Sequence, residues 1–264
     1  MATPFRIKRS AVPGKVPQVA DLQLGELALN TNDAELYTLR ARAGLATDVV
    51  RVGAGASIRN VIYVTKDGKD TNTGKKPGDA KATVKAAVAI ASTIPGSIVK
   101  VSAGTYVENN PIKVGPQVSI VGDSLREVTV VPQNAGEDLF HVAPGDLISD
   151  MSFTGTMLKG KAVTAFDPDT IRYSGQSPYL LNCTNFITNS IGMKIDGSKV
   201  IGPFKSFVCD SFTQYNQNGV GCSITNEGYA QLVSLFSINS AESIFCVSGG
   251  QCDITNSNSS FGHY

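Results

Sequence analysis

A repeat of short apolar runs in the C-terminal third most constrains what this chain can fold into. The run Cys183–Phe186 aligns with Cys209–Phe212 about 26 residues later, and Ser234–Phe236 follows after a similar step. A repeat of this length, built from several short strand-like runs, is typical of one coil of a solenoid. We therefore predict an all-β protein that folds as a right-handed parallel β-helix, with an antiparallel β-sandwich as the alternative.

The repeat also predicts which residues stack inside the coil. Matching second runs lie between the first ones, and polar turns close each unit. Because like residues of successive coils lie above one another, the Cys and Phe positions would form internal ladders, and Asn and Ser would occupy the turns. The second runs that align with one another are 191–193, 220–222 and 244–246.

The cysteines lie entirely in this third of the chain: Cys183, Cys209, Cys222, Cys246 and Cys252. Their number is odd, and no CxxC motif or Cys/His pair occurs at the spacing of a zinc site. We interpret them as reduced thiols that pack as small apolar side chains, because a chain of this length with its own core does not need a disulfide framework.

The middle of the chain predicts strands around a single helix. A strand at 61–64 is followed by a polar loop at 66–74, and Asp79 is a candidate N-cap for a helix over about 79–94, stopped by Pro95-Gly96. The absence of later helical patterns argues against alternating strands and helices. Further short β runs lie at 98–101, 118–121 and 128–131.

Changes in residue composition along the chain predict its domain organisation. Residues 1–52 contain a basic, proline-containing arm and two strand-like runs, 24–29 and 35–39, joined by turn residues. A lone hairpin is not stable in water, so we expect this segment to order only against a partner or copies of itself. Residues 53–60 are predicted to be a flexible linker, and residues 61–264 the β-helix with its N-terminal capping helix.

Composition excludes several classes of protein. The chain has 23 Lys and Arg against 22 Asp and Glu, a formal net charge of +1, which argues against a nucleic-acid-binding protein. No apolar run approaches the roughly 18 residues of a membrane span. Met1–Lys15 lacks the apolar region of a secretory signal, which disfavours a secreted carbohydrate-binding module.

Candidate catalytic carboxylates do not form a recognisable set. A lyase needs carboxylates beside a basic residue, and a glycosidase needs two carboxylates about 5 to 9.5 Å apart. The sequence shows no carboxylates recurring at coil spacing beside a suitable Arg, and the acidic residues beside Pro and Gly are typical of exposed turns. The pairs available for these roles are Asp146 with Asp150, Asp167 with Asp169, and Asp210 with Glu227 or Glu242.

Metal binding has equally weak support. The loop containing Asp67, Asp70 and Asn72 could offer oxygen ligands to calcium, but it lacks the bidentate Glu of an EF-hand, and turn formation explains it better. His141 and His263 have no companion at ligand spacing. We predict no catalytic residues, no metal site and no cofactor.

Residues from about 61 to 131 resemble the opening of pectate-lyase-like β-helix proteins. The shared elements are 62–64, 68–74, 83–88 and 99–108, the last containing Gly-Thr-Tyr-x-Glu. The resemblance implies that the helix caps the open end of the β-helix and that Gly104–Glu108 turns into the first coil. These motifs are specific for fold rather than for activity. The later catalytic segments of pectin methylesterases, which share this turn, have no counterpart here.

The first zone resembles the N-terminal segment of virion proteins from tailed bacteriophages, particularly long-genome myophages that infect cyanobacteria. The resemblance rests on 7–10, 12–17, 24–30 and 33–39. It implies an attachment module that precedes a fibre or spike body. The residues to which we assign docking on other virion proteins are Arg6, Lys8, Arg9, Leu24, Glu26, Leu27 and Tyr37.

These inferences predict a non-enzymatic structural protein of a phage virion, a tail fibre, tailspike-like or baseplate-associated component assembled in the host cytoplasm. Its expected partners are tail or baseplate proteins and copies of itself. The sequence ends at Phe261–Tyr264 without a capping helix, so we expect either other subunits or further chain to cover that end, and a homotrimer would do so. Host surface glycan is a further candidate partner. The alternative is a depolymerase or lyase that cuts such a glycan.

Overall fold

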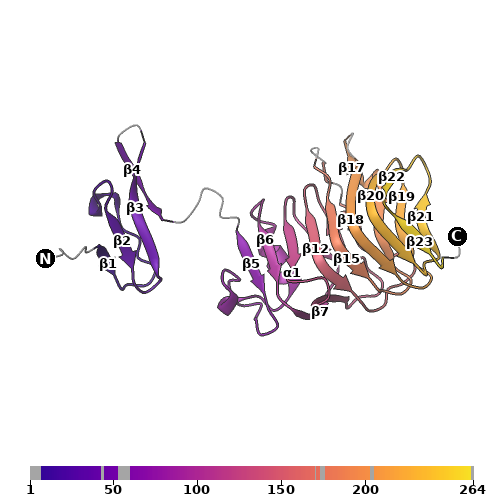
Figure 1. Cartoon of the computed structure of the whole chain (residues 1–264), viewed down its shortest axis with the longest axis horizontal. Coiled ribbons are helices and arrows are strands. Elements are labelled where there is room, and N and C mark those ends of the chain that lie inside the picture. Colours follow the sequence, from indigo (N-terminus) through magenta and orange to yellow (C-terminus); the bar gives the residue numbers. More distant parts are fainter. Residues whose placement is uncertain are drawn as a thin grey trace. The chain divides into compact units, whose positions relative to one another are not determined.

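The computed structural model describes the backbone of residues 7–42, 45–52, 60–169, 171–172, 176–202 and 205–262. The chain divides into two compact units, Met1–Ile58 and Arg59–Tyr264, whose elements are labelled in Figure 1. The predicted linker, residues 53–60, lies outside the described residues except for Asn60. No described helix is long and apolar enough to cross a membrane.

The first unit is a four-stranded sheet rather than a lone hairpin with an extended arm. Its strands, in sheet order, are β1 (Lys8–Ser10), β2 (Leu27–Asn30), β3 (Glu35–Arg42) and β4 (Leu45–Arg51). Strands β2 and β3 are the predicted antiparallel hairpin, while β1 pairs in parallel with β2 and β4 pairs antiparallel with β3. Leu22, Ala28, Tyr37 and Leu39 form a small buried core. The expectation that the hairpin has no support of its own is therefore wrong.

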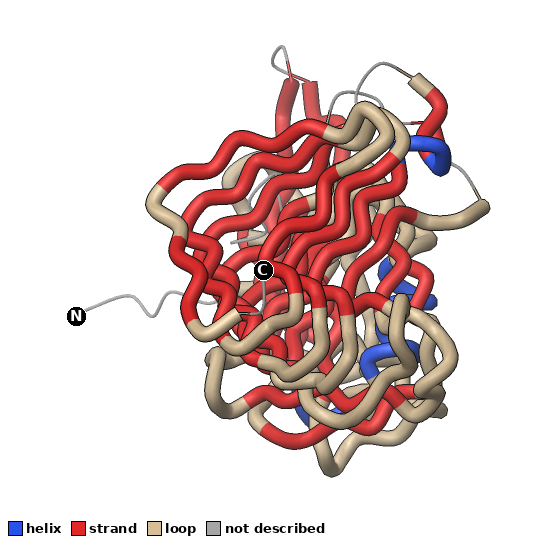
Figure 2. Tube along the Cα trace, turned by 90° about the vertical axis from the view of Figure 1, so that its right-hand side faces the viewer, coloured by secondary structure: helices blue, strands red, loops and turns tan. Residues whose placement is uncertain are grey.

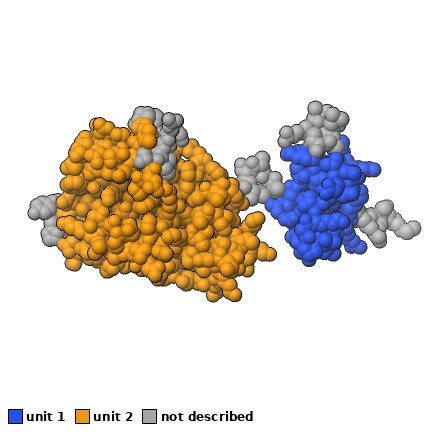
Figure 3. Space-filling model, turned by 180° about the vertical axis from the view of Figure 1, so that it is seen from behind, with its two compact units in different colours: residues 1–58 blue, residues 59–264 orange. Residues whose placement is uncertain are grey.

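The second unit is a parallel β-helix, which confirms the predicted fold class (Figure 2). All strand pairs described in this unit are parallel, so the antiparallel sandwich is excluded. Figure 3 shows the unit as one packed body. The strands of its eleven-stranded sheet are β5 (Val61–Val64), β6 (Ile98–Val101), β7 (Gly104–Glu108), β9 (Ser119–Gly122), β10 (Val128–Pro132), β12 (Leu147–Phe153), β15 (Tyr179–Asn185), β18 (Ser206–Tyr215), β20 (Tyr229–Ile238), β22 (Gln251–Thr255) and β23 (Asn258–Ser260).

A six-stranded sheet forms the third side of the coils from β6 to β21, and a short extra pair lies between coils. The six strands are β8 (Ile112–Lys113), β11 (Phe140–Val142), β13 (Ala162–Phe166), β16 (Ile191–Asp196), β19 (Val220–Thr225) and β21 (Glu242–Cys246). The extra pair is β14 (Ile171–Arg172) with β17 (Val200–Ile201), and each of these strands follows one of the six and precedes the next coil. We call the six-stranded sheet the third face of the β-helix.

The eleven-stranded sheet bends into two faces along a line of left-handed residues. The first face contains β5, β6, β9, β22 and the first halves of β12, β15, β18 and β20. The second face contains β7, β10, β23 and the remaining halves. Asn, Asp and Ser accept positive φ more readily than most residues because they can hydrogen-bond locally. The bend residues are Asp150 (φ 59°), Asn182 (48°), Ser211 (57°), Ser234 (51°) and Asn256 (48°).

Inward-facing residues of successive coils stack as predicted, but in a different register. Cys183 lies opposite Met151 and Phe212, whereas Cys209 lies opposite Leu180 and Leu232. The predicted alignment of Cys183 with Cys209 is therefore wrong by three residues, because Cys183 pairs with residue 212. The left-handed bend, which must coincide in neighbouring coils, sets the true register.

The second runs of the repeat are closer to the prediction. Met193 lies opposite Cys222 as expected, but Cys222 lies opposite Ile244 rather than Cys246. A shift of two residues keeps the same alternation of inward and outward side chains in a strand. All five cysteines are free thiols, of which Cys183, Cys209 and Cys222 are buried, Cys252 is half-buried and Cys246 is exposed.

The capping helix is shorter than predicted. Helix α1 spans Val84–Ala91, and its N-cap is Thr83, whose hydroxyl accepts a hydrogen bond from Ala86 N at 3.1 Å. Asp79 instead ends a 3-10 turn, η2 (Pro77–Asp79), and accepts from Thr73 N at 3.2 Å. The buried side of α1 contacts β5 to β8, so the helix closes this end of the β-helix.

The polar loop that precedes η2 holds the start of α1. Asp70 Oδ1 accepts hydrogen bonds from Ala82 N and Thr83 N, both at 3.0 Å. Asn72 donates to Ala80 O at 2.8 Å. A Cβ on Gly68 would lie 2.2 Å from Lys81 O, so only glycine lets the two segments approach this closely.

Candidate functional site

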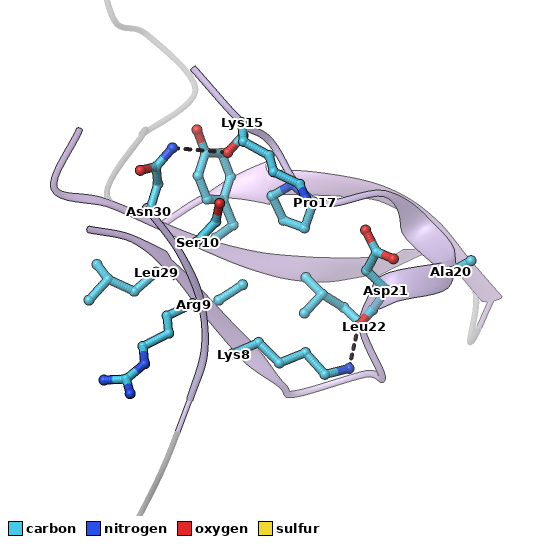
Figure 4. A pocket seen from close by; sticks show the side chains of 12 residues that line it. Lys8, Arg9, Ser10, Lys15, Pro17, Ala20, Asp21, Leu22, Leu29 and Asn30 are labelled. Atoms are coloured by element: carbon cyan, nitrogen blue, oxygen red, sulfur yellow. Dashed lines mark hydrogen bonds between the residues drawn. The ribbon is translucent and has the colours of Figure 1, made fainter. Parts of the chain in front are cut away.

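The first unit contains an open cavity of about 530 Å³ on one side of its sheet. The buried side chains of Leu22, Ala28 and Tyr37 contribute an apolar floor. Figure 4 shows the side chains that line it. The lining residues are Lys8, Arg9, Ser10, Lys15, Pro17, Ala20, Asp21, Leu22, Ala28, Leu29, Asn30 and Tyr37.

The chain between β1 and β2 forms one wall of this cavity, and Asn30 fixes its position. The Asn30 amide donates to Val12 O at 3.0 Å. It also donates to Lys15 O at 3.1 Å (Figure 4). Asp33 Oδ2 accepts from Gly14 N at 2.6 Å. The segment then turns through η1 (Val19–Asp21) and places Leu22 in the core. The β2–β3 turn therefore anchors the wall.

The rim of the cavity carries more positive than negative side chains. Lys8 donates to the carbonyl of Asp21 and pairs with Glu26 at 2.9 Å. A hydrogen bond from Gln23 N, and then the Lys8 ammonium, hold the pKa of Glu26 below its usual value. Arg9 and Lys15 form no side-chain ion pair with the described residues. Two cationic side chains are thus available to an incoming partner, and the alternation along β1 turns Arg9, like its neighbour Leu29, to the side opposite Lys8 and Ala28 (Figure 4).

Tyr37 is held by a charged pair on its own face of the sheet. Its hydroxyl donates to Glu35, which raises the pKa of Tyr37, and Glu35 also pairs with Arg51 at 2.5 Å. The hydrogen bond from Tyr37, followed by that from Arg51, lowers the pKa of Glu35. The ring is 5% exposed, so it acts as a fixed part of the cavity floor.

The structure brings three of the predicted docking residues together. Lys8, Arg9 and Tyr37 line the cavity. Glu26 contacts Lys8 at the edge, Leu27 is half-buried in β2, and Leu24 is 53% exposed outside the lining. Arg6 lies outside the described residues.

Sequence reasoning missed the wall that faces these residues. Lys15 and Pro17 belong to the stretch interpreted as a basic, proline-containing arm, and Asp21 was assigned no role. The available signal was Gly14, which adopts a left-handed φ of 68° and reverses the chain before Lys15.

A second group of ionisable residues lies on the outward side of the third face. Lys113 Nζ lies 3.0 Å from Asp167 Oδ2 and 2.7 Å from Asp169 Oδ2. The hydrogen bond to Asp169, and then that to Asp167, raise the pKa of Lys113. His141 Nε2 lies 3.4 Å from Asp138 Oδ2. Because β8, β11 and β13 are neighbours, Lys113, His141 and Ala165 stack in one outward row.

A small hollow of about 80 Å³ adjoins this group. Ala165 is the shortest side chain of the row, which continues to Lys194, and the hollow lies between Asp138 and Asp196. Burial opposes ionisation of Asp138, but hydrogen bonds from His141 and Ala162 N outweigh it and lower the pKa of Asp138. Within the described part of the chain, no group of three or more His, Cys, Asp or Glu residues could hold a metal ion.

Three of the other carboxylates weighed for catalysis form hydrogen bonds or an ion pair within the β-helix. Asp146, expected to be an exposed turn residue, is 1% exposed and accepts from Val118 N at 3.1 Å and Ala143 N at 2.6 Å. Asp150 accepts from Asn182 at the bend. Glu227 pairs with Lys205 at 2.7 Å. His263 lies outside the described residues.

The chain matches no protein-family model and no curated protein. Among solved structures it is similar to a rhamnogalacturonan lyase, with 14% identity and a TM-score of 0.43 over 77% of this chain and 62% of that one. The chain thus spans less than two thirds of that lyase.

Two phage proteins of known structure are similar at lower scores. ORF18 of Geobacillus virus E2 has 14% identity and a TM-score of 0.30 over 91% of this chain and 70% of that one. The tailspike protein gp49 of Acinetobacter baumannii bacteriophage Fri1, a capsular polysaccharide depolymerase, has 13% identity and a TM-score of 0.31 over 97% and 58% of the two chains. Similarity at this level assigns no activity or substrate to this chain.

Proposed function

We propose that this protein is a structural component of a bacteriophage virion, a tail fibre, tailspike-like or baseplate-associated protein. Residues 1–52 dock on another virion protein, and the β-helix from residue 61 forms a rigid, host-facing body that self-associates as a homotrimer. The observation that carries the proposal is the cavity of the first unit, which joins an apolar floor to a cationic rim.

The chemistry of this cavity defines the partner segment that fits it. Interface energy concentrates where an apolar or aromatic anchor fills a desolvated pocket, and opposite charges at the rim orient the partner. Leu22, Ala28 and Tyr37 provide the pocket, while Lys15 at its wall and Arg9 on the other side of β1 provide the charge. The matching segment therefore carries an apolar anchor flanked by acidic residues.

Incorporation into virions tests the proposal. Particles are assembled with the wild-type chain or with Arg9→Glu/Lys15→Glu, and the purified virions are immunoblotted. The double variant should be absent from virions, as should a chain lacking residues 1–58. The control is Lys75→Glu/Lys76→Glu, which makes the same charge change at exposed sites of the β-helix and should leave incorporation intact. Wild-type incorporation of the cavity variant would contradict the proposal, provided that circular dichroism shows it folded.

The alternative function is depolymerisation of a host surface glycan by hydrolysis or elimination. The observation that favours it is the group formed by Lys113, Asp138, His141, Asp167 and Asp169, in which bases and carboxylates lie within hydrogen-bonding reach. Such proximity is what proton transfer to and from a substrate requires.

Purified host glycan distinguishes the two functions. The non-enzymatic proposal expects no new reducing ends and no fall in polymer size after incubation with the full chain. Release that persists in Lys75→Met but is lost in His141→Asn and Lys113→Met would establish the alternative and assign it to this group.

A further inference from the structure

The strands of the second face carry almost no charge of their own, and the charged groups at its first coil are the ammonium groups of Lys66 and Lys85, which donate to Thr105 O and Asn109 O. This face runs over β7, β10, β23 and the later halves of β12, β15, β18 and β20, which lie side by side. In these strand segments the only ionisable acidic or basic residue is Glu108, which is buried. The corners that follow are also uncharged in the described stretches 109–111, 133–136, 154–158, 186–190, 216–219 and 239–241.

Apolar and aromatic side chains project from this face. Phe186 and Tyr215 occupy neighbouring coils, with ring centroids 6.0 Å apart in an edge-to-face arrangement. They are 36% and 48% exposed, and Val107 and Phe236 are 59% and 39% exposed. We call this set of outward residues the uncharged strip: Val107, Val131, Thr154, Phe186, Tyr215, Phe236 and Ile238.

The other two faces differ from the strip. The third face presents Lys113, His141 and Lys194 in one outward row. The first face presents Lys100, which pairs with Asp123 at 3.0 Å. The uncharged strip is therefore a local property of one face and not a consequence of the low charge of the chain.

We propose that the uncharged strip is the surface through which copies of this chain pack side by side. Depletion of charge together with exposed aromatic residues is the signature of the centre of a protein interface. A partner surface must also lack charge, since burying an unpaired charge costs far more than apolar contact returns. The same strip on another copy meets this condition.

The strip also has the length and repeat that such packing needs. Strands from β7 to β23 are spaced by about 4.8 Å, which gives a strip roughly 30 Å long. Copies related by rotation about an axis parallel to the β-helix keep equivalent coils at equal height, so each exposed ring meets the same coil of its neighbour. The inference rests on the homotrimer of the proposed function and assigns the face that forms it.

The solution mass of the full chain tests this assignment. Light scattering during size-exclusion chromatography should give three times the chain mass of 27.7 kDa for the wild type. Phe186→Lys/Tyr215→Lys, which places like charges against one another across the interface, should reduce the mass to that of a single chain. The matched control is Tyr179→Lys/Val208→Lys, a register pair of β15 and β18 on the first face of the same two coils, and it should keep the wild-type mass.

Circular dichroism and thermal melting establish that each variant keeps its β-helix. A single-chain mass for the wild type, or an unchanged mass for the folded strip variant, overturns the assignment. So does binding of a neutral polysaccharide to a wild type of single-chain mass that is lost in Phe186→Lys/Tyr215→Lys, since the strip would then be a glycan surface. None of these measurements involves a virion, so their failure leaves docking through the first unit untouched.

Discussion

Glu108 and Val84 join the end of the first coil to the helix that closes it. Glu108 Oε1 accepts a hydrogen bond from Val84 N at 2.7 Å, and Oε2 accepts one from Lys85 N at 3.0 Å. These N–H groups open α1 and have no partner within the helix. The Glu of Gly-Thr-Tyr-x-Glu thus completes the N-terminus of a helix that begins 24 residues earlier. Tyr106 of the same motif is buried and donates to Ser102 O at 2.9 Å.

Replacing Glu108 should destabilise the β-helix through this contact. Glu108→Met keeps a side chain of similar length but leaves two N–H groups without acceptors, a loss of about 1–3 kcal/mol for each buried group. Urea denaturation followed by circular dichroism measures the free energy of unfolding. Glu127→Gln, at an exposed position, should change it by less than about 0.5 kcal/mol. Equal stability of Glu108→Met and the wild type would show that the helix does not depend on this cap.

Asp146 should make the β-helix less stable at alkaline pH. Burial raises the pKa of Asp146 to about 8, whereas the unfolded chain has a value near 3.9. The stability contributed by the protonated carboxyl is fully present below the unfolded pKa and is lost as pH rises through about 8. The urea midpoint should therefore fall between pH 5 and pH 9, and fall less in Asp146→Asn. Asp67→Asn, at an exposed loop position, should retain the wild-type pH dependence; the same slope in all three proteins would contradict this origin.

A β-branched residue in place of Asn182 should destabilise the β-helix at the bend. Its φ of 48° lies in the left-handed region, and its amide donates to Asp150 Oδ1 at 2.8 Å. Asn182→Val and Asn182→Gly both lose this hydrogen bond, but only valine is strained there, by roughly 1–3 kcal/mol. Chemical denaturation should show Asn182→Val to be less stable than Asn182→Gly by about that amount. Indistinguishable unfolding curves for the two variants would contradict a left-handed conformation at Asn182.

Thiol labelling should separate the cysteines by burial. Burial raises the pKa of Cys183 and of Cys209 to about 12, and that of Cys222 well above its usual value. Since the thiolate is the reactive form, a maleimide at neutral pH should modify exposed Cys246 first and half-buried Cys252 more slowly. Mass spectrometry should find the other three modified only after unfolding. Rapid modification of Cys183 in the native protein would be inconsistent with its place in the core.

The fold class could be predicted from the sequence because it depends on local signals. Turn residues at regular steps and alternating apolar residues identify short strands wherever they pair. The opening motif identified the helix and the first coil. The register depended instead on bend residues such as Asn182 and Ser211, which resemble ordinary turn residues in the sequence. The match of Cys183 to Cys209 in the sequence predicted that these two residues stack. The connection that contains β17 (Val200–Ile201) adds residues to that coil, so Cys183 stacks on Phe212 instead.

The candidate site was predictable only where its residues are close in the chain. Lys8 and Arg9 form a visible basic pair, but Lys15 and Asp21 reach the same cavity through the turn that Asn30 holds. Similarly, Lys113 and Asp169 are 56 residues apart and meet only because coils stack. Contacts made by stacking depend on the length of every connection in between, and a single sequence does not reveal those lengths.

The short pair of β14 and β17 bears on how this molecule could diversify. Both strands lie in connections that leave the third face and return to the first, while the bends between the first and second faces recur in each later coil. Insertions at that one corner lengthen a surface loop without moving any interior ladder. Selection could therefore remodel this corner while the interior of the β-helix stays the same.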